Sequence, residues 1–298
     1  MIYTNTKSLP APIYRAVAEA EHNTGTAHYS VTELLDSPRV KHLERKFDAQ
    51  LSADVAGFSN ALLGNGADRL FKEHSVYPEI AGLRLGINIE VDGKVYEISG
   101  EFDWFDPESG WLVDLKTPGT YEWFHPKAER EAQLNIYRFI ILVNAQDPDS
   151  PVSGCTVQRM SNCFAFKGHS PAQAKYTKDY PTSIDVRDVA MWPIDQTREF
   201  IKERIRLHRD ATDETLCSDD ERWMDSKYAV VPVSGGRAVN GGANFEELDQ
   251  AEAFRGTLKE PDKYEVQYRL GEPKRCIDWC AVGIAGLCEQ WNGEGGGA

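Results

Sequence analysis

Residues 98–119 read ISGEFDWFDPESGWLVDLKTPG and place two carboxylates and a lysine in an apolar setting. The turn sequence PESG separates two predicted strands, so Asp103 and Asp114 belong to neighbouring strands. Side chains two residues apart on a strand point to the same face, which puts Lys116 beside Asp114. The stretch therefore predicts three charged groups gathered at one edge of a sheet.

The pair formed by Asp114 and Lys116 has two interpretations. On spacing alone, an acid and a lysine in this arrangement are often a solvated ion pair. The neighbouring residues favour a buried strand instead: they are Trp111, Leu112, Val113 and Leu115. A buried charge requires a partner or a metal. Two carboxylates suit Mg²⁺ or Mn²⁺, and a lysine can orient a water or stabilise charge on a phosphate, so the combination favours phosphodiester hydrolysis.

The pattern around this stretch predicts an α/β (α+β) fold with a central mixed sheet flanked by helices. Upstream helices are predicted, one of them capped by Ser30 or Thr32. Strands begin near residue 83 and form a meander to residue 117, with Asp92 and Gly93 as a two-residue hairpin turn. A helix follows over residues 126–145, with Gln133 and Tyr137 on one face. One or two strands in 153–166 and a charged helix over 194–210 complete the core.

Changes in composition predict three parts of the chain. Residues 1–212 form the core with its N-terminal helical region. Residues 213–291, rich in turns and short strands, form a small C-terminal appendage. Residues 292–298, NGEGGGA, are predicted to be a flexible tail.

The formal net charge of −14 argues against nonspecific coating of nucleic acid, so a polyanion would need a local basic patch. Two candidate stripes exist: Arg39, Lys41, Arg45 and Lys46, and Lys202, Arg204, Arg206 and Arg209. Both are interleaved with acids, which favours a solvated charged face for either stripe. No apolar run is long enough for a membrane helix and no signal-peptide layout is seen at the start, so we expect a cytoplasmic protein without membrane contact.

Three of the six cysteines crowd into one short stretch, RCIDWCAVGIAGLC. Cys276, Cys280 and Cys288 need one more ligand for a tetrahedral site, and Cys217 is the natural candidate. The alternatives are structural Zn²⁺, a four-iron four-sulfur cluster, or four buried thiols without a metal. The remaining two cysteines, Cys155 and Cys163, are predicted to pack as small apolar residues.

Three motifs in order resemble the PD-(D/E)xK nuclease superfamily, in its RecB-like branch that includes lambda-type phage exonucleases. The branch pattern is G-x-x-D on one strand, D/E-x-K on the next and Q-x-x-x-Y on the following helix. Its matches here are Gly100 with Asp103, Asp114 with Lys116, and Gln133 with Tyr137. The resemblance implies a restriction-endonuclease-like core.

The resemblance also implies roles for individual residues. Asp103, Asp114 and the Leu115 carbonyl would be metal ligands, and Lys116 would be the catalytic lysine. Gln133 and Tyr137 would position DNA and the active-site groups. Asp68 stands where the branch often has a metal-binding histidine, and Glu79 is the nearest match to a further acidic ligand. Several relatives carry an iron–sulfur cluster with one cysteine upstream of the nuclease motifs; Ser37 occupies that place here.

The function that this resemblance implies is a Mg²⁺- or Mn²⁺-dependent exonuclease that hydrolyses DNA at duplex ends, in phage recombination or repair. By analogy, a ring-shaped homo-oligomer and a single-strand annealing protein as recombination partner are expected. Two alternatives remain. One is an end-trimming or structure-specific endonuclease resembling those of CRISPR adaptation, and the other is a catalytically silent module that binds DNA or a partner.

Overall fold

The computed structural model describes residues 1–19, 26–239 and 243–296. The chain divides into two compact units, which are described separately. Unit 1 comprises Met1–His42 and Ser52–Thr212, and unit 2 comprises Leu43–Leu51 and Asp213–Ala298. The sequence does not predict that the short segment Leu43–Leu51 belongs with the C-terminal residues.

A three-stranded sheet in unit 1 has the order β2-β5-β4. Its strands are β2 (Tyr29–Ser30), β4 (Arg84–Val91) and β5 (Lys94–Glu101). Strand β4 alternates strictly from Leu85 to Val91 between buried apolar and exposed residues, as expected for one covered face. Asp92 and Gly93 both have positive φ, 53° and 77°, which confirms the two-residue hairpin turn.

A four-stranded mixed sheet in the same unit has the order β6-β7-β8-β9. Its strands are β6 (Trp104–Asp106), β7 (Trp111–Lys116), β8 (Arg159–Ala165) and β9 (Ile184–Asp188). β7 runs antiparallel to β6 and parallel to β8. The predicted meander is therefore interrupted, because β5 ends at Glu101 and β6 belongs to another sheet. Asp103 lies in the two-residue connection between them, not on a strand as the sequence suggests.

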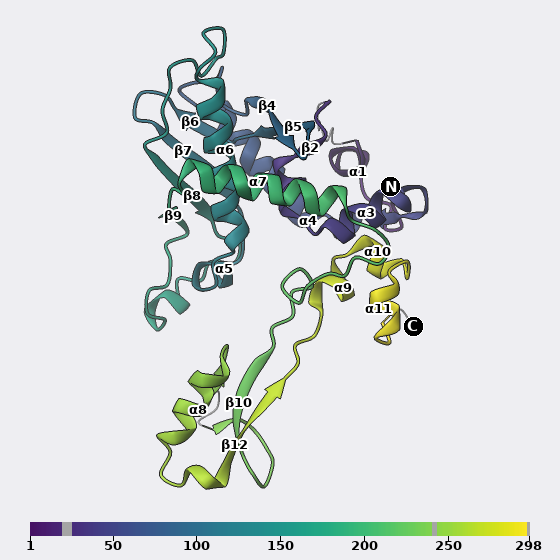
Figure 1. The fold of residues 1–298 in the computed structure, drawn as a ribbon, viewed down its shortest axis with the longest axis vertical. Helices are drawn as coiled ribbons and strands as arrows, with labels where there is room; N and C mark the ends of the chain where they lie inside the picture. The colour runs from purple at the N-terminus through teal and green to yellow at the C-terminus, as the bar shows by residue number, and fades with distance from the viewer. Residues whose placement is uncertain (20–25, 240–242, 297–298) are drawn as a thin grey trace. The chain divides into compact units, whose positions relative to one another are not determined.

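Helix α6 is the central helix of unit 1: it packs against β4, β5, β7 and β8 and against the helices α2 and α7, which pack on each other (Figure 1). The helices of this unit are α1 (Ala11–Ala18), α2 (Val31–Leu35), α4 (Ser59–Glu73), α5 (Tyr121–Phe124), α6 (Ala128–Asn144) and α7 (Ile194–Arg209), with α3 (Pro38–Lys46) running into the segment of unit 2. Ser30 Oγ accepts a hydrogen bond from Glu33 N at 3.1 Å, which confirms this residue as the N-cap of α2.

The core of unit 1 lies between α6 and the strands. Its largest fully buried side chains include Leu34, Ile98, Phe102, Phe105, Leu112 and Ile136. The short strands β1 (Ile2–Thr4) and β3 (Ser52–Asp54) pair in parallel apart from these sheets, and 3₁₀ turns are found at Val55–Gly57 and Gln173–Lys175. The segment 153–166 contains one strand, β8, which confirms the lower of the two expected numbers.

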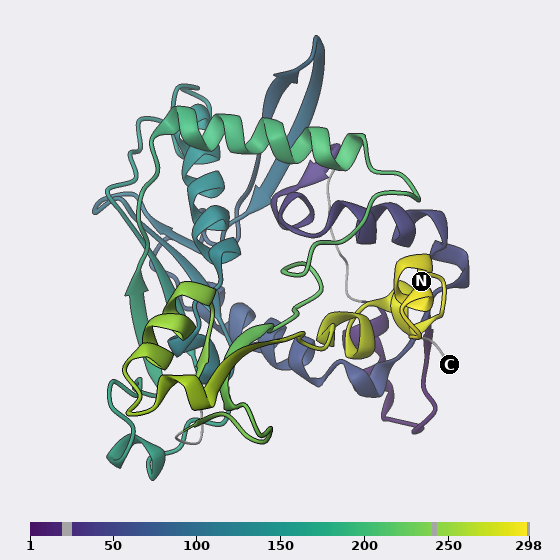
Figure 2. The same ribbon diagram turned by 60° about the horizontal axis from the view of Figure 1, so that its bottom comes forward.

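Unit 2 contains a three-stranded antiparallel sheet with the order β11-β10-β12, against which α8 packs (Figure 2). Its elements are β10 (Lys227–Pro232), β11 (Asn244–Phe245), α8 (Leu248–Gly256), β12 (Tyr264–Arg269), α9 (Lys274–Asp278), α10 (Ala281–Ile284) and α11 (Glu289–Gly293), with 3₁₀ turns at Asp48–Gln50 and Pro261–Lys263. The predicted tail 292–298 begins inside α11, and its last two residues lie outside the described part. No helix in the described ranges combines the length and apolarity required to cross a membrane.

Candidate active site

Gly100 on β5 is the contact point between the sheet and helix α6. A Cβ atom at this position would lie 2.6 Å from Cε1 of Tyr137 and 2.8 Å from Cγ2 of Val31. Only glycine leaves room for the Tyr137 ring at this distance. Gln133 Nε2 donates a hydrogen bond to Tyr137 Oη at 3.0 Å, and both side chains are buried. The glycine, glutamine and tyrosine of the first and third motifs thus form one packed group.

Asp103 and Asp114 are joined through the backbone of β7. Leu115 N donates to Asp103 Oδ2 at 2.6 Å, and Lys116 Nζ lies 2.5 Å from Asp114 Oδ2. The Asp114 side chain is 2% exposed and that of Lys116 is 16% exposed, so the carboxylate is removed from solvent and the ammonium only in part. The N–H and C=O of one strand residue point to the same side of the strand, which directs the Leu115 carbonyl toward Asp103 as well.

The carboxyl groups influence one another. Burial, and after it the charge of Asp114, raises the pKa of Asp103 to about 7, while Lys116 and the Leu115 N–H act in the opposite direction and Asp68 adds a smaller increase. Burial and then the charge of Asp114 also raise the pKa of Tyr137. The structure therefore brings six of the predicted residues, from β7, α4, α6 and the β5–β6 connection, into one electrostatic environment.

Asp68 on α4 is part of a charged network that the sequence does not reveal. Lys72 Nζ lies 2.8 Å from Asp68 Oδ2 and 2.8 Å from Glu101 Oε1. Arg84 pairs with the other oxygen of Glu101 at 3.3 Å. Arg84 and Glu101 are directly opposite on β4 and β5, so their pairing could be recognised only after the strand register was known. Two cations and one acid thus connect Asp68 on α4 to the β4–β5 hairpin.

Two buried oxygens have neither a hydrogen-bond donor nor a cation beside them among the described residues. They are Asp68 Oδ1 and the Oδ1 of Asn162, which is the register partner of Asp114 on β8. Asp114 Oδ2 makes no hydrogen bond within these ranges, and the ammonium of Lys116 lies 2.5 Å from it as an ion-pair partner. Buried oxygen acceptors without donors form the ligand chemistry that a hard divalent cation requires, so these residues fit such an ion.

Glu79, the other candidate ligand upstream, lies apart from these contacts. It is exposed in the turn before β4. Within the described ranges, no three His, Cys, Asp or Glu side chains are already arranged around a common metal position. The role of Glu79 stays a prediction.

The cysteines of unit 2 are gathered around α9, α10 and α11. Cys276, Cys280 and Cys288 are buried. Burial raises the pKa of the Cys280 thiol, and its neighbours Cys276 and Cys288 raise it further. Cys217 is tied to the same region through its backbone: its N–H donates to Gln290 Oε1 at 2.9 Å, and Gln290 Nε2 donates to its carbonyl at 3.1 Å. The structure thus brings the four predicted cysteines into one part of unit 2.

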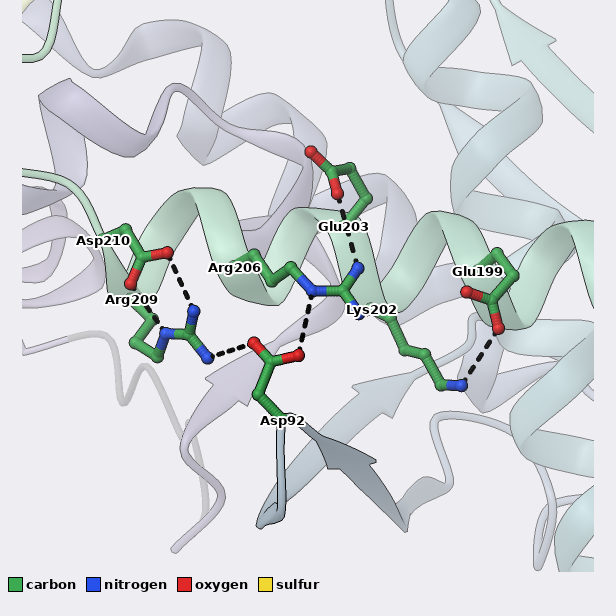
Figure 3. A network of polar contacts seen from close by, with 7 residues as sticks. All are labelled: Asp92, Glu199, Lys202, Glu203, Arg206, Arg209 and Asp210. Carbon is green, nitrogen blue, oxygen red and sulfur yellow. Dashed lines mark hydrogen bonds and ion pairs between the residues drawn. The ribbon is translucent and has the colours of Figure 1, made fainter.

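The cationic residues of α7 are engaged in contacts within unit 1 (Figure 3). Lys202 pairs with Glu199 at 3.0 Å, and Arg209 pairs with Asp92 at 2.8 Å. Arg206 lies 3.4 Å from Asp92 and 3.5 Å from Glu203. Arg204 donates to the carbonyls of Leu34 and Asp36 at 2.6 Å each. These contacts favour a structural role for this stripe over a path for phosphates.

The N-terminal stripe is similar. Arg39 is buried, Lys41 lies 3.2 Å from Asp36, and Lys46 pairs with Asp213 inside unit 2. These contacts favour a structural role for Arg39, Lys41 and Lys46 as well.

No protein-family model and no curated protein matches this sequence. Among solved structures, one described as the crystal structure of SSO0001 aligns with 66% of this chain and 85% of its own, at 15% sequence identity and a TM-score of 0.46.

Proposed function

We propose that this protein is a metal-dependent DNA exonuclease with the restriction-endonuclease-like core of the RecB-like nucleases. The observation that carries the proposal is a pair of carboxylates, the buried Asp114 and the half-buried Asp103, held against Lys116 at the end of β7. Two carboxylates that are close together and shielded from solvent are stable in their charged form only beside a cation. One lysine offsets one of the two charges, which leaves a negative site suited to a divalent ion.

The residues of the site have separate roles in this proposal. Asp103, Asp114 and the Leu115 carbonyl would hold Mg²⁺ or Mn²⁺, with Asp68 as a further oxygen donor. When bound, the cation would supply an acidified water and a counter-charge for the phosphate.

Lys116 would orient the attacking water and stabilise the charge that develops on the phosphate. Tyr137, fixed by Gln133 and by its contact with Gly100, keeps α6 at a constant distance from the carboxylates.

A substrate panel tests this function. Duplex and single-stranded DNA, linear and circular, labelled at the 5′ or 3′ end, are incubated with Mg²⁺ or Mn²⁺. We expect progressive shortening of linear DNA and no cleavage of circles. Cleavage of circular DNA would identify an endonuclease instead, and no hydrolysis under any condition would overturn the enzymatic proposal.

Three variants connect the activity to the site. Asp114→Ala and Lys116→Ala should each abolish cleavage, a loss of roughly a hundredfold or more because each removes a group that acts on the transition state. Glu90→Ala is the matched control, since Glu90 is an exposed acid on β4. Activity retained in both site variants would contradict the assignment.

For unit 2 we propose that Cys217, Cys276, Cys280 and Cys288 hold either a four-iron four-sulfur cluster or Zn²⁺. The burial of three thiols and the pairing of Cys217 with Gln290 support this proposal. Elemental analysis and the visible spectrum of anaerobically purified protein distinguish iron–sulfur from zinc. Cys276→Ser should release the metal, whereas Cys163→Ser, on β8, should not. If the purified wild-type protein contained neither iron nor zinc, the proposed metal site of unit 2 would be overturned.

A further inference from the structure

A surface beside the candidate active site is formed by α5 and the segment of residues 166–183. Gly119 and Lys167 form an isolated parallel bridge, and Lys167 N donates to the Pro118 carbonyl at 2.8 Å. Trp123 Nε1 on α5 donates to the Asp179 carbonyl at 3.1 Å. These contacts make the two segments one continuous surface, called the α5 shelf below.

Exposed aromatic rings are concentrated on the α5 shelf. Tyr121 is 67% exposed, Phe124 is 42% exposed and Tyr176 is 88% exposed. The ring of Tyr121 stacks on His125 with centroids 4.0 Å apart and planes inclined by 18°. Large aromatic side chains left in solvent together mark a binding surface, and flat exposed rings suit partners that also have a π-face.

The charge of the α5 shelf is opposite to that of the whole chain. The α5 shelf contains three lysines and two acids in a protein of net charge −14; they are Lys167, Lys175 and Lys178 with Glu122 and Asp179. Glu122 is buried and already pairs with Arg130 at 2.9 Å. Lys175 has no ion-pair partner in the described part of the chain. The shelf is thus a local site for an anion in an acidic protein.

Packed residues connect the α5 shelf to the candidate site. Phe164 is the register partner of Lys116, and its ring lies 6.1 Å from that of Trp123 on α5. The lining of a hollow of about 240 Å³ includes Asn162 and Phe164 on β8 and Glu122 on α5. Asn162 is the register partner of Asp114, so the β8 wall of this hollow belongs to the strand next to that of Asp114.

From these observations we infer that the α5 shelf binds the unstacked, single-stranded end of a nucleic acid whose scissile phosphate enters the site. Bases would stack on Tyr121, Phe124 and Tyr176, and phosphates would contact the lysines. In a duplex the bases stay stacked on one another, so only its phosphates could contact the shelf, through the lysines. The placement of the scissile phosphate in the candidate site rests on the proposed nuclease function. The binding of the single strand to the α5 shelf does not depend on hydrolysis.

Binding in EDTA tests the inference without turnover. A fluorescein-labelled single strand of about fifteen nucleotides and a blunt duplex of the same sequence are titrated by anisotropy. The variant Tyr121→Ala/Tyr176→Ala should bind the single strand roughly tenfold or more weakly, and the duplex within about twofold of the wild type. Tyr268→Ala is the matched control, because Tyr268 is a 54% exposed tyrosine in unit 2.

Two further variants separate stacking from charge. Tyr121→Phe/Tyr176→Phe keeps the rings and should retain binding. The affinity for the single strand falls as the salt concentration rises, and Lys175→Ala/Lys178→Ala should make the plot of log K against log salt less steep by about 1.4. Each contact with a single-stranded phosphate contributes about 0.7 to this steepness. Lys259→Ala, at an exposed lysine of unit 2, should leave the slope unchanged.

The outcomes also distinguish this inference from the proposed function. Unchanged single-strand binding by the double tyrosine variant, or equal weakening for single strand and duplex, overturns the inference even if the wild type hydrolyses DNA. Selective loss of single-strand binding supports it even if no hydrolysis is found, in which case only the nuclease proposal fails. Circular dichroism of each variant verifies that the fold is intact.

Discussion

At the scale of single residues, Gly100 determines how closely α6 approaches the sheet. Gly100→Ala would place a Cβ 2.6 Å from the Tyr137 ring, so ring and helix must shift. We expect a loss of about 1–3 kcal/mol in the free energy of unfolding. Urea denaturation measures it.

The control for this substitution is Gly66→Ala in α4, where no atom lies within 4 Å of an added Cβ. Alanine is a better helix former than glycine, so this variant should be unchanged or more stable by up to about 1 kcal/mol. Equal stability of the wild type and Gly100→Ala would contradict the packing that we describe.

Asp103 gives a prediction for the pH dependence of stability. Its pKa in the folded protein, about 7, lies above its ordinary value of 3.8, first because of burial and then because of Asp114. Folding therefore favours the protonated carboxyl. Its contribution to stability is complete below about pH 4 and is lost as the pH rises through about 7.

Asp103→Asn removes this titration. Urea unfolding in EDTA between about pH 4 and pH 8 should show the variant gaining stability relative to the wild type as the pH rises. Taking the difference between the two proteins cancels the other titrating groups. A difference that is constant with pH would show that the carboxyl is not buried beside Asp114.

The residues of the candidate site could be predicted from the sequence to different degrees. The alternation of β7 put Asp114 and Lys116 on one face, and the four-residue spacing put Gln133 beside Tyr137; both contacts are present. Lys72 and Glu101 were not predicted, because they meet across elements 29 residues apart and no local pattern records such a pairing.

At the scale of elements, the β4–β5 hairpin is tied to α7 through its turn (Figure 3). Asp92 occupies a left-handed conformation, φ 53°, and its carboxylate pairs with Arg206 and Arg209. The charges are 31–48% exposed, so their contribution is small and depends on salt.

Asp92→Asn keeps a residue that tolerates this conformation and removes the charge. We expect a loss below about 1 kcal/mol at low salt that shrinks at high salt. Asp92→Ala should cost more, because alanine adopts a positive φ at an added cost of about 1 kcal/mol. Urea unfolding at two salt concentrations measures both, and a salt-independent loss in Asp92→Asn would contradict an electrostatic tie.

Long periodic elements could be predicted well, whereas interruptions could not. α6 shows its apolar stripe in the sequence and lies where it was predicted. Local sequence does not indicate that β5 ends before Asp103 or that the chain is irregular before β8. The partner strands determine where the pairing stops.

At the scale of the whole molecule, unit 2 is assembled from two stretches that are distant in the sequence. Leu43 and Leu51 at the ends of the short stretch are 3% and 1% exposed. A chain ending at Thr212 keeps this stretch but lacks the rest of its unit. Hydrogen exchange should therefore be faster in residues 43–51 of the shortened chain than in the intact protein.

The strand Trp111–Lys116 is the internal control, since its sheet lies wholly in unit 1 and its exchange should be unchanged. Equal protection of residues 43–51 in both chains would show that this stretch is ordered without the C-terminal residues.

This interleaving also has a consequence for synthesis. The ribosome synthesises Leu43–Leu51 long before it reaches Asp213, the first residue of the second stretch of unit 2. At about 5–20 residues per second, roughly 10–30 s separate the two events. During that interval the end of α3 and the 3₁₀ turn after it are present without the residues that complete their unit. Unit 1 ends at Thr212 and is therefore fully synthesised before unit 2 can form, so the two units complete their folding in that order.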